Sequence, residues 1–364
     1  MEITQKEIKL GKSLLVPSVQ EMVKQPIAEI PPRYLQPDQN TPNTSSDVSL
    51  PQLSVPIIDL ESLLTPGSVG DLELDRLDSA CKEWGFFQLI NHGVSSSLVE
   101  KVQLETQDLF RLPMIEKKKY WQTEEEVEGF GQAFVVSEEQ KLDWADIFYL
   151  TTLPIHGRKP HLFPKLPLPF RDTLDSYSLE LKSLAMTLIK VMAKALQIET
   201  KVIEELFEDG LQSMRMNYYP PCPQPDLVIG LKSHSDSVAL TILLQLNEVE
   251  GLQVIKDGKW VPIKPLSNAF IVNIGDILEI LTNGIYRSVH HRAIVNSTKE
   301  RLSIATFLNP NPEGEISPIG SLITPSTPAL FKTVGVKQYL QDLFTRELDG
   351  KSYLDCMKID GNTT

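Results

Sequence analysis

The centre of the chain reads VIGLKSHSDSVALTILL (residues 228–244), in which two apolar runs enclose His234 and Asp236. Short apolar runs rich in branched residues are typical of buried strands. Alternate side chains of a strand point to the same side, so a continuous strand would present the imidazole and the carboxylate together, about 6.6 Å apart. The stretch therefore predicts a β-rich core that carries a pair of metal-binding side chains.

A second histidine and an arginine–serine pair follow at spacings that suit the same site. His291 lies 55 residues after Asp236, and the triplet RLS at 301–303 begins ten residues after His291. Two imidazoles and one carboxylate make the facial triad that holds non-haem Fe(II) and leaves coordination positions open. Arg301 and Ser303 share one face of a strand, and a guanidinium fork beside a hydroxyl suits a carboxylate ligand. The pattern predicts an iron oxygenase with a dicarboxylate cosubstrate.

Longer motifs accompany this pattern. They are WGFFQLINHG at 84–93, GFGQ at 129–132 and NYYPPCPQP at 217–225. With the histidines, the aspartate and the RLS triplet, the chain resembles the plant 2-oxoglutarate- and Fe(II)-dependent dioxygenases over about 16–354, and in detail their senescence-related branch, which also contains the morphinan O-demethylases. The resemblance implies an α+β fold: a double-stranded β-helix (jelly-roll) barrel with an N-terminal α/β cap region and supporting helices.

The resemblance also implies a role for each matching position. It makes Fe(II), 2-oxoglutarate and O2 the cofactor and cosubstrates, with ascorbate as an additional reductant. The implied metal ligands are His234, Asp236 and His291, and the residues implied to hold 2-oxoglutarate are Arg301, Ser303, Tyr219 and Asn217. Positions 217 and 219 lie on one face of a strand, as a shared cosubstrate site requires.

Three phenylalanines are candidates for the wall of an organic-substrate pocket. Phe307, the aromatic implied by the resemblance, lies on the same face as Ser303, four residues along one strand. Phe130 and Phe134 belong to a glycine-flanked segment, and glycine permits loop movement. The alternative is that all three belong only to the core. Apolar walls suit a polycyclic ligand, so we expect hydroxylation or O-demethylation of a small plant alkaloid, phenolic or terpenoid.

One position departs from the relatives' pattern. The residue before the third metal ligand is usually acidic in the family, and here it is His290. Neighbours on a strand face opposite sides, so only one of the two adjacent histidines can join the triad. The following Arg292 and the ten-residue gap to Arg301 favour His291. Two other readings stay open: a zinc or manganese cupin enzyme, and a non-catalytic metabolite-binding protein on the same fold.

Composition narrows the class of protein. The chain has 364 residues, of which 41% are hydrophobic and 23% charged, as in ordinary globular proteins. Its net charge of −13 argues against binding nucleic acid or anionic membranes. No apolar run approaches the length of a membrane span, and the first residues lack the apolar core of a secretory signal. The three cysteines make no disulfide framework. We expect a cytoplasmic monomer acting on a small molecule.

The chain divides into four expected regions. They are an N-terminal helix and flexible linker (1–52), a dioxygenase region with scaffold helices (53–205), the jelly-roll core (206–312) and a C-terminal helical extension (313–364). Apolar spacing predicts helices, and apolar runs predict strands. The expected helices are 16–24, 71–82, 96–112, 170–196 and 336–343; the expected strands include 55–60, 86–90, 286–295 and 302–307, with a hairpin turning at 257–258.

Overall fold

The computed structural model describes residues 12–27, 29–37, 53–132, 134–345 and 350–359. Residues 38–52, which include most of the flexible linker expected within 1–52, lie outside the described residues. The helix expected over 16–24 is the short α1 (Val19–Met22), which begins after Ser18, whose side chain accepts a hydrogen bond from the Glu21 amide. This short helix ends four residues before Pro26.

Two β-sheets form the core of the described part of the chain. The larger has the strand order β1-β2-β10-β7-β12-β5-β4-β3, and the smaller has the order β6-β11-β8-β9. The larger sheet consists of β1 (Ile57–Asp59), β2 (Phe86–Ile90), β3 (Gly129–Gly131), β4 (Asp146–Leu153), β5 (Gln212–Tyr219), β7 (Leu240–Gln245), β10 (Phe270–Ile274) and β12 (Arg301–Leu308). The smaller consists of β6 (Leu231–His234), β8 (Leu252–Lys256), β9 (Lys259–Pro262) and β11 (His291–Ala293). Together they make the predicted jelly roll.

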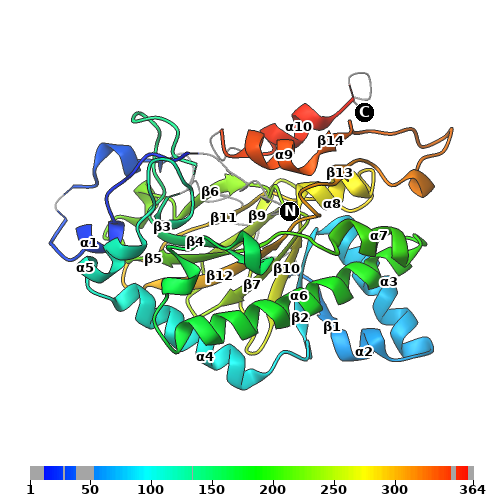
Figure 1. Cartoon of the computed structure of the whole chain (residues 1–364), viewed down its shortest axis with the longest axis horizontal. Coiled ribbons are helices and arrows are strands. Elements are labelled where there is room, and N and C mark those ends of the chain that lie inside the picture. Colours follow the sequence, from blue (N-terminus) through cyan, green and yellow to red (C-terminus); the bar gives the residue numbers. More distant parts are fainter. Residues whose placement is uncertain (1–11, 28, 38–52, 133, 346–349, 360–364) are drawn as a thin grey trace, which may run out of the picture.

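Helices pack around the sheets (Figure 1). They are α2 (Leu60–Leu64), α3 (Ser68–Glu83), α4 (Ser96–Arg111), α5 (Met114–Lys117), α6 (Phe170–Ala195), α7 (Thr200–Phe207), α8 (Asp276–Leu281), α9 (Val336–Leu343) and α10 (Ser352–Met357). A small pair of strands, β13 (Glu315–Ile316) and β14 (Val334–Gly335), precedes α9. None of the described helices is long and apolar enough to cross a membrane.

The long helix α6 supports the larger sheet. It contacts β4, β7 and β12 on one side and α3 and α4 on others, and Figure 1 shows it lying along the sheet. Its apolar stripe includes Leu174, Leu181 and Leu188, all fully buried at seven-residue intervals. Burying each such side chain stabilises the fold by about 1.5–3 kcal/mol. The predicted scaffold helix is therefore confirmed, and it holds the strands that carry the site.

The predicted hairpin is also present. Strands β8 and β9 pair in register, and the turn between them places Asp257 at φ 50° and Gly258 at φ 73°. Two consecutive residues with positive φ define the type I′ turn, whose twist matches that of paired strands and which favours an Asp-Gly sequence.

Two expected strands are shorter than predicted. β6 ends at His234 and β7 begins at Leu240, so Asp236 lies in the loop between them rather than on a continuous strand. The start of α8 packs against this loop: the Asp276 amide donates to the Asp236 carbonyl over 2.7 Å, which takes that group away from any ladder. Of the strand expected at 286–295, only His291–Ala293 forms. The backbone amides of residues 286–288 before it donate hydrogen bonds to groups that are not part of a neighbouring strand.

The larger sheet takes strands from both sides of residue 205, where we expected one region to end. Strands β1 to β4 come from the N-terminal region, and β5, β7, β10 and β12 come from the core region. The four-region division stays a prediction about the chain, but the barrel itself needs both halves.

Candidate active site

The three expected metal ligands converge at one end of the barrel. His234 ends β6, His291 begins β11 directly opposite it, and Asp236 lies in the loop that follows β6. The Nε2 atoms of His234 and His291 lie 3.4 Å and 3.6 Å from Asp236 Oδ1. All three ligand atoms fall within 4.8 Å of one another. Ligands bound at right angles to one metal stand about 3 Å apart, so the cluster is close to the geometry of a metal site.

Neighbouring backbone carbonyls orient both imidazoles. His234 Nδ1 lies 2.8 Å from the Lys232 carbonyl, and His291 Nδ1 lies 3.3 Å from the Val289 carbonyl. A carbonyl only accepts, so each Nδ1 carries the proton and each Nε2 turns a lone pair toward the cluster. Burial, followed by the nearby His234, lowers the pKa of His291 to about 4, which favours the neutral, ligating form.

The two oxygen atoms of the Asp236 carboxylate have different partners. Thr241 Oγ1 and Asn273 Nδ2 donate to its Oδ2 over 2.6 Å and 2.8 Å, while Oδ1 faces the two imidazoles. Burial by itself raises the pKa of a carboxyl, but His291, His234 and the Thr241 hydroxyl hold the pKa of Asp236 well below its ordinary value. The ligand set is two imidazoles and one carboxylate, and its chemistry fits Fe(II).

The other of the two adjacent histidines, His290, lies outside this cluster. His290 Nδ1 is 3.4 Å from the Ser233 hydroxyl, and the His290 side chain lines a separate surface cavity. The two adjacent histidines face opposite sides, as strand geometry requires, and the structure brings His291 to His234 and Asp236.

The four expected cosubstrate residues line one cavity, which His234, Asp236 and His291 also line. β12 and β5 pair so that Arg301 lies opposite Tyr219 and Ser303 opposite Asn217. Arg301 is only 2% exposed; its Nη2 donates to Gln245 Oε1 over 3.0 Å, and its Nε has no partner. Asn217 Oδ1 is also buried without a partner. A buried donor without a partner is costly, so this guanidinium fits an anionic ligand.

A second, mainly apolar cavity lies on the other side of the metal cluster. Phe307 lines both cavities, and Phe134 lines this second one. The Phe134 ring stacks on that of Phe344, with centroids 4.8 Å apart, and Phe134 has φ 68°, a rare conformation for a bulky residue. The two rings form one wall of the cavity, and Phe344 comes from the end of the C-terminal helix α9.

The packing of Phe130 supports the alternative reading, a place in the core. This residue is not among those lining the second cavity, and its ring packs 4.6 Å from that of Phe148 and against Phe110 and Trp121 in the core. Phe130 pairs with Phe148 across β3 and β4, whereas Tyr149 next to it faces the cavity. Alternation of faces decides the outcome: the period of the strand turns Phe130 away from the site.

Several residues of the site were not singled out from the sequence. They are Thr241, Asn273, Arg215, Tyr149, Leu340, Leu343 and Phe344. Two of them stand in a sequence pattern from which they could have been predicted. Asn273 is a polar residue inside the apolar run FIVNI, and Arg215 shares a strand face with Asn217 and Tyr219. The C-terminal residues carry none, because only folding brings them over the barrel.

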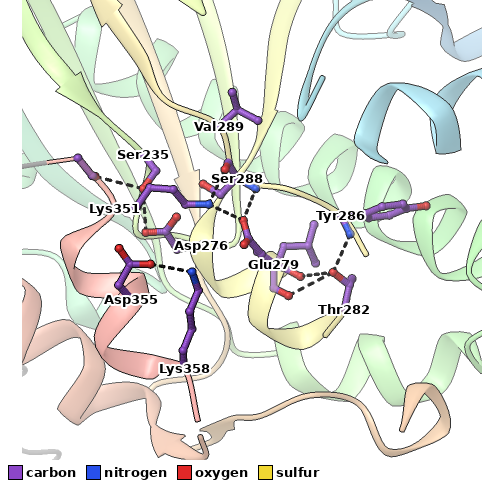
Figure 2. Close-up of polar contacts among 12 residues, drawn as sticks. Ser235, Asp276, Glu279, Thr282, Tyr286, Ser288, Val289, Lys351, Asp355 and Lys358 are labelled. Atoms are coloured by element: carbon purple, nitrogen blue, oxygen red, sulfur yellow. Dashed lines mark hydrogen bonds and ion pairs between the residues drawn. The ribbon is translucent and has the colours of Figure 1, made fainter. Parts of the chain in front are cut away.

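The C-terminal segment, residues 350–359, also contacts the backbone beside the metal-binding residue His234. Gly350 forms a parallel bridge with His234: the Ser235 amide donates to the Gly350 carbonyl over 3.2 Å, and the Gly350 amide to the Ser233 carbonyl over 3.3 Å. Figure 2 shows Ser235 and Asp276 beside Lys351. Asp276 Oδ2 accepts hydrogen bonds from the Ser235 and Ser237 hydroxyls, at 3.1 Å and 3.2 Å. These serines flank Asp236, so α8 fixes its loop.

A partly buried ion pair fastens this segment to α8. Lys351 Nζ lies 2.8 Å from Glu279 Oε2 and donates to the Ser288 carbonyl over 2.7 Å, and the Ser288 amide donates to the same carboxylate oxygen (Figure 2). Replacing Lys351 with methionine removes the cation from a nearly buried carboxylate. We expect Lys351→Met to lower the free energy of unfolding by about 1–3 kcal/mol, measured by urea denaturation.

The matched control for this prediction lies a few residues further along the same segment. Lys358 pairs with Asp355 over 2.8 Å, but both side chains are more than half exposed. Exposed pairs contribute at most about 1 kcal/mol, so Lys358→Met should leave the unfolding midpoint nearly unchanged. Equal losses in the two variants would show that Lys351 does not clamp the segment.

Comparison with known proteins agrees with this geometry. Residues 210–310 match the profile of the 2OG-Fe(II) oxygenase superfamily, and residues 55–166 match that of the "non-haem dioxygenase in morphine synthesis N-terminal" region. Together the two matches span more than half of the chain. The 210–310 match contains His234, Asp236 and His291 and every residue that lines the cosubstrate cavity except Phe86, which lies in the 55–166 match.

Individual relatives match along almost the whole chain. The chain is 60% identical to Protein SRG1 of Arabidopsis thaliana over 95% of its own length and 97% of the relative's. It is 58% identical to codeine O-demethylase of Papaver somniferum (97% and 98%) and 55% identical to oxoglutarate-dependent flavonoid 7-O-demethylase 1 of Ocimum basilicum (96% and 93%).

A solved structure supports the fold and the cofactors. The crystal structure of JOX2 in complex with 2OG, Fe and JA superposes with a TM-score of 0.85 and 36% identity, over 94% of this chain and 98% of that one. The fold, the converging ligands and the relatives agree: the chain belongs to the 2OG-Fe(II) oxygenase superfamily and is a 2-oxoglutarate-dependent dioxygenase of the branch that includes the morphinan O-demethylases.

Proposed function

We propose a specific role for each residue of the site. His234, Asp236 and His291 bind one Fe(II), Arg301 and Ser303 bind the distal carboxylate of 2-oxoglutarate, and Tyr219 and Asn217 hold the rest of the cosubstrate. The main support for the proposal is that each of the three metal-binding side chains has one atom held by a hydrogen bond and another that faces the proposed metal position. Both Nδ1 atoms and Asp236 Oδ2 have hydrogen-bond partners, and both Nε2 atoms and Oδ1 face a common point.

The protein's contribution to the reaction is mainly orientation. When bound, Fe(II) with 2-oxoglutarate and O2 supplies the oxidising power that inserts oxygen into a C–H bond, with release of succinate and CO2. The chain's own residues hold the cosubstrate carboxylate at Arg301, orient the two imidazoles through the Lys232 and Val289 carbonyls, and present the substrate at Phe307. No side chain has to act as an acid or base, because selectivity depends on which C–H bond is placed nearest the metal.

The substrate we propose is a small, ring-containing plant specialised metabolite. The second cavity supports this: its walls include Phe307, Phe134, Phe344 and Leu340, and few of its lining residues are charged. The names of the codeine and flavonoid demethylases among the relatives point to ring compounds that carry methyl ethers. Hydroxylating an O-methyl carbon gives a hemiacetal that breaks down to an alcohol and formaldehyde, so hydroxylation and O-demethylation are two fates of one reaction.

The test is an aerobic screen of plant alkaloids, phenolics and terpenoids with Fe(II) and 2-oxoglutarate. Products should gain one oxygen atom or lose one methylene unit, and succinate should appear in step with them. Dependence on zinc or manganese without 2-oxoglutarate consumption would favour another cupin enzyme. Ligand binding without succinate release would favour a non-catalytic binding protein.

Phe307 offers a direct test of the pocket. It lies two residues beyond Ala305 on β12, at the junction of the two cavities. Phe307→Ala removes a large apolar contact from the substrate, worth about 1–3 kcal/mol, so the KM for a substrate found in the screen should rise about tenfold. The KM for 2-oxoglutarate should stay the same. Phe130→Leu, in the core, is the control and should change neither constant; an unaltered substrate KM in Phe307→Ala would remove Phe307 from the pocket.

We further infer that the enzyme acts as a cytoplasmic monomer, without nucleic-acid or membrane partners. The net charge of −13 supports this, because a surface of that sign repels phosphate backbones and anionic lipids. The three cysteines are free thiols, which suits a reducing compartment. Sedimentation of the purified protein and imaging of a tagged chain in plant cells are the two measurements.

A further inference from the structure

Arg215 is a buried cation at the centre of the site that the mechanism above does not use. It lies on β5, opposite Ala305 of β12, and lines both the cosubstrate cavity and the apolar cavity. Its side chain is 8% exposed, and its Nε is buried without a hydrogen-bond partner. No ion pair or side-chain hydrogen bond joins Arg215 to any residue that the structure describes. A buried charge in this state destabilises a fold unless a ligand completes it.

The buried acid Asp143, whose pKa the charge of Arg215 affects, forms no ion pair with it. The charge of Arg215 affects the pKa of the buried Asp143, but Lys232 affects that pKa more strongly, and burial outweighs both and raises it. Asp143 Oδ1 accepts a hydrogen bond from the Lys232 amide over 3.2 Å. The polar pair beside Arg215 is also satisfied internally, because the Tyr149 hydroxyl donates to Ser213 Oγ over 3.0 Å. The guanidinium therefore lacks an acceptor inside the protein.

The position of Arg215 separates it from the distal carboxylate of the cosubstrate. Tyr219, beside Arg301, marks the carboxylate end of the cavity, and the backbone of Arg215 lies four residues from that of Tyr219 along β5, which corresponds to about 13 Å. Both side chains line the cosubstrate cavity, but Arg215 also lines the apolar cavity, which Tyr219 and Arg301 do not. Arg215 thus lies at the substrate end of the site, next to Phe307 and Asn309, and the buried Asn309 Oδ1 is also unpartnered.

The net charge of the site with Fe(II) and 2-oxoglutarate bound is consistent with a substrate group that accepts hydrogen bonds from Arg215. Fe(II) with Asp236 leaves one positive charge, Arg215 and Arg301 raise this to three, and the 2-oxoglutarate dianion brings it back to one. An arginine has five N–H donors and no acceptor, so the group that meets it must accept hydrogen bonds. A carbonyl, phenolate or carboxylate oxygen satisfies these conditions, and an ammonium group at this point does not.

On these grounds, and resting on the proposed function, we propose that Arg215 is the residue that selects and orients the organic substrate by binding an oxygen acceptor on its ring system. The apolar walls bind the rings without fixing their rotation, and a single charged donor fixes it. The residue therefore helps to decide which C–H bond faces the metal, and the substrate class is narrowed to ring compounds with an acceptor oxygen.

Binding is tested with two probes that differ in one acceptor: 7-methoxyflavanone, which carries a ring carbonyl, and 7-methoxyflavan, which has a methylene group in its place. Calorimetry uses the full chain with Fe(II) and 2-oxoglutarate under anaerobic conditions. Wild type should bind the flavanone about tenfold to a hundredfold more tightly than the flavan. Arg215→Met should lose that preference while its affinity for 2-oxoglutarate stays unchanged. Equal binding of the probes by wild type, or no binding of either, overturns the proposed ligand class.

Stability gives a second readout that needs no ligand. Replacing an unpaired buried charge with an apolar side chain of similar size should raise the Tm of the ligand-free protein. A structural arginine would show the opposite, a lower Tm, and this result would overturn the proposal. A loss of 2-oxoglutarate affinity in Arg215→Met would also overturn it and assign the residue to the cosubstrate. Arg111→Met, at an exposed arginine of α4, is the control and should change neither Tm nor probe binding.

These outcomes are distinct from a failure of the proposed function. If the enzyme releases no succinate with any metabolite in the screen, the function fails whatever Arg215 binds. If succinate is released and the probe preference is absent from wild type, only the role of Arg215 fails.

Discussion

Asp236→Ala is expected to abolish turnover, with succinate formation reduced by at least about a thousandfold, because it removes the one carboxylate from a site whose other ligands are two imidazoles. The carboxylate also joins Thr241 and Asn273 to the cluster, so its loss frees both of their hydrogen bonds. Metal content after dialysis against limiting Fe(II) should fall in parallel. Full turnover in this variant would mean that the metal binds elsewhere.

The adjacent histidines give this prediction an internal control. His291→Ala should lose turnover and metal together, because His291 Nε2 faces Asp236. His290→Ala should retain most activity, because the His290 side chain contacts Ser233 and lines a different cavity. The two variants delete the same group at neighbouring positions, and because His291 is buried and His290 is only partly buried, the unfolding midpoint of each variant is measured to separate a loss of stability from the loss of a ligand. The reverse result would transfer the third ligand to His290.

The second large effect is expected at Arg301. This side chain is almost fully buried, and its Nε lacks a partner until a carboxylate binds. Lysine keeps the charge but loses the planar fork, so Arg301→Lys should raise the KM for 2-oxoglutarate about tenfold to a hundredfold and leave the KM for the organic substrate nearly the same. Steady-state succinate release at varied 2-oxoglutarate is the measurement.

A matched control for Arg301 lies on the neighbouring sheet. Arg292 of β11 stacks on Trp260, with its guanidinium carbon 4.2 Å from the ring centroid, and its Nε donates to Gln253 Oε1 over 2.8 Å. Both contacts lie outside the cosubstrate cavity. Arg292→Lys should therefore leave the KM for 2-oxoglutarate at the wild-type value. A rise in both variants, or in neither, would place the cosubstrate carboxylate away from Arg301.

Local patterns in the chain were enough for much of the fold and the core of the site. The apolar periodicity of 170–196 predicts α6, and the Asp-Gly pair at 257–258 predicts a hairpin, because both depend on neighbours in sequence. The residue types and spacing of His234, Asp236 and His291 indicate the triad for the same reason: few combinations of groups bind Fe(II) in this way.

Contacts between distant segments decided the rest. Asp236 leaves the strand because α8 takes its backbone carbonyl, and Phe130 turns into the core because its register with Phe148 sets its face. Phe344 closes the pocket although it follows Phe134 by more than two hundred residues. Sequence periodicity reports which side chains share a face, but the partner of that face is set by tertiary packing, where the burial free energy of the whole chain selects one arrangement.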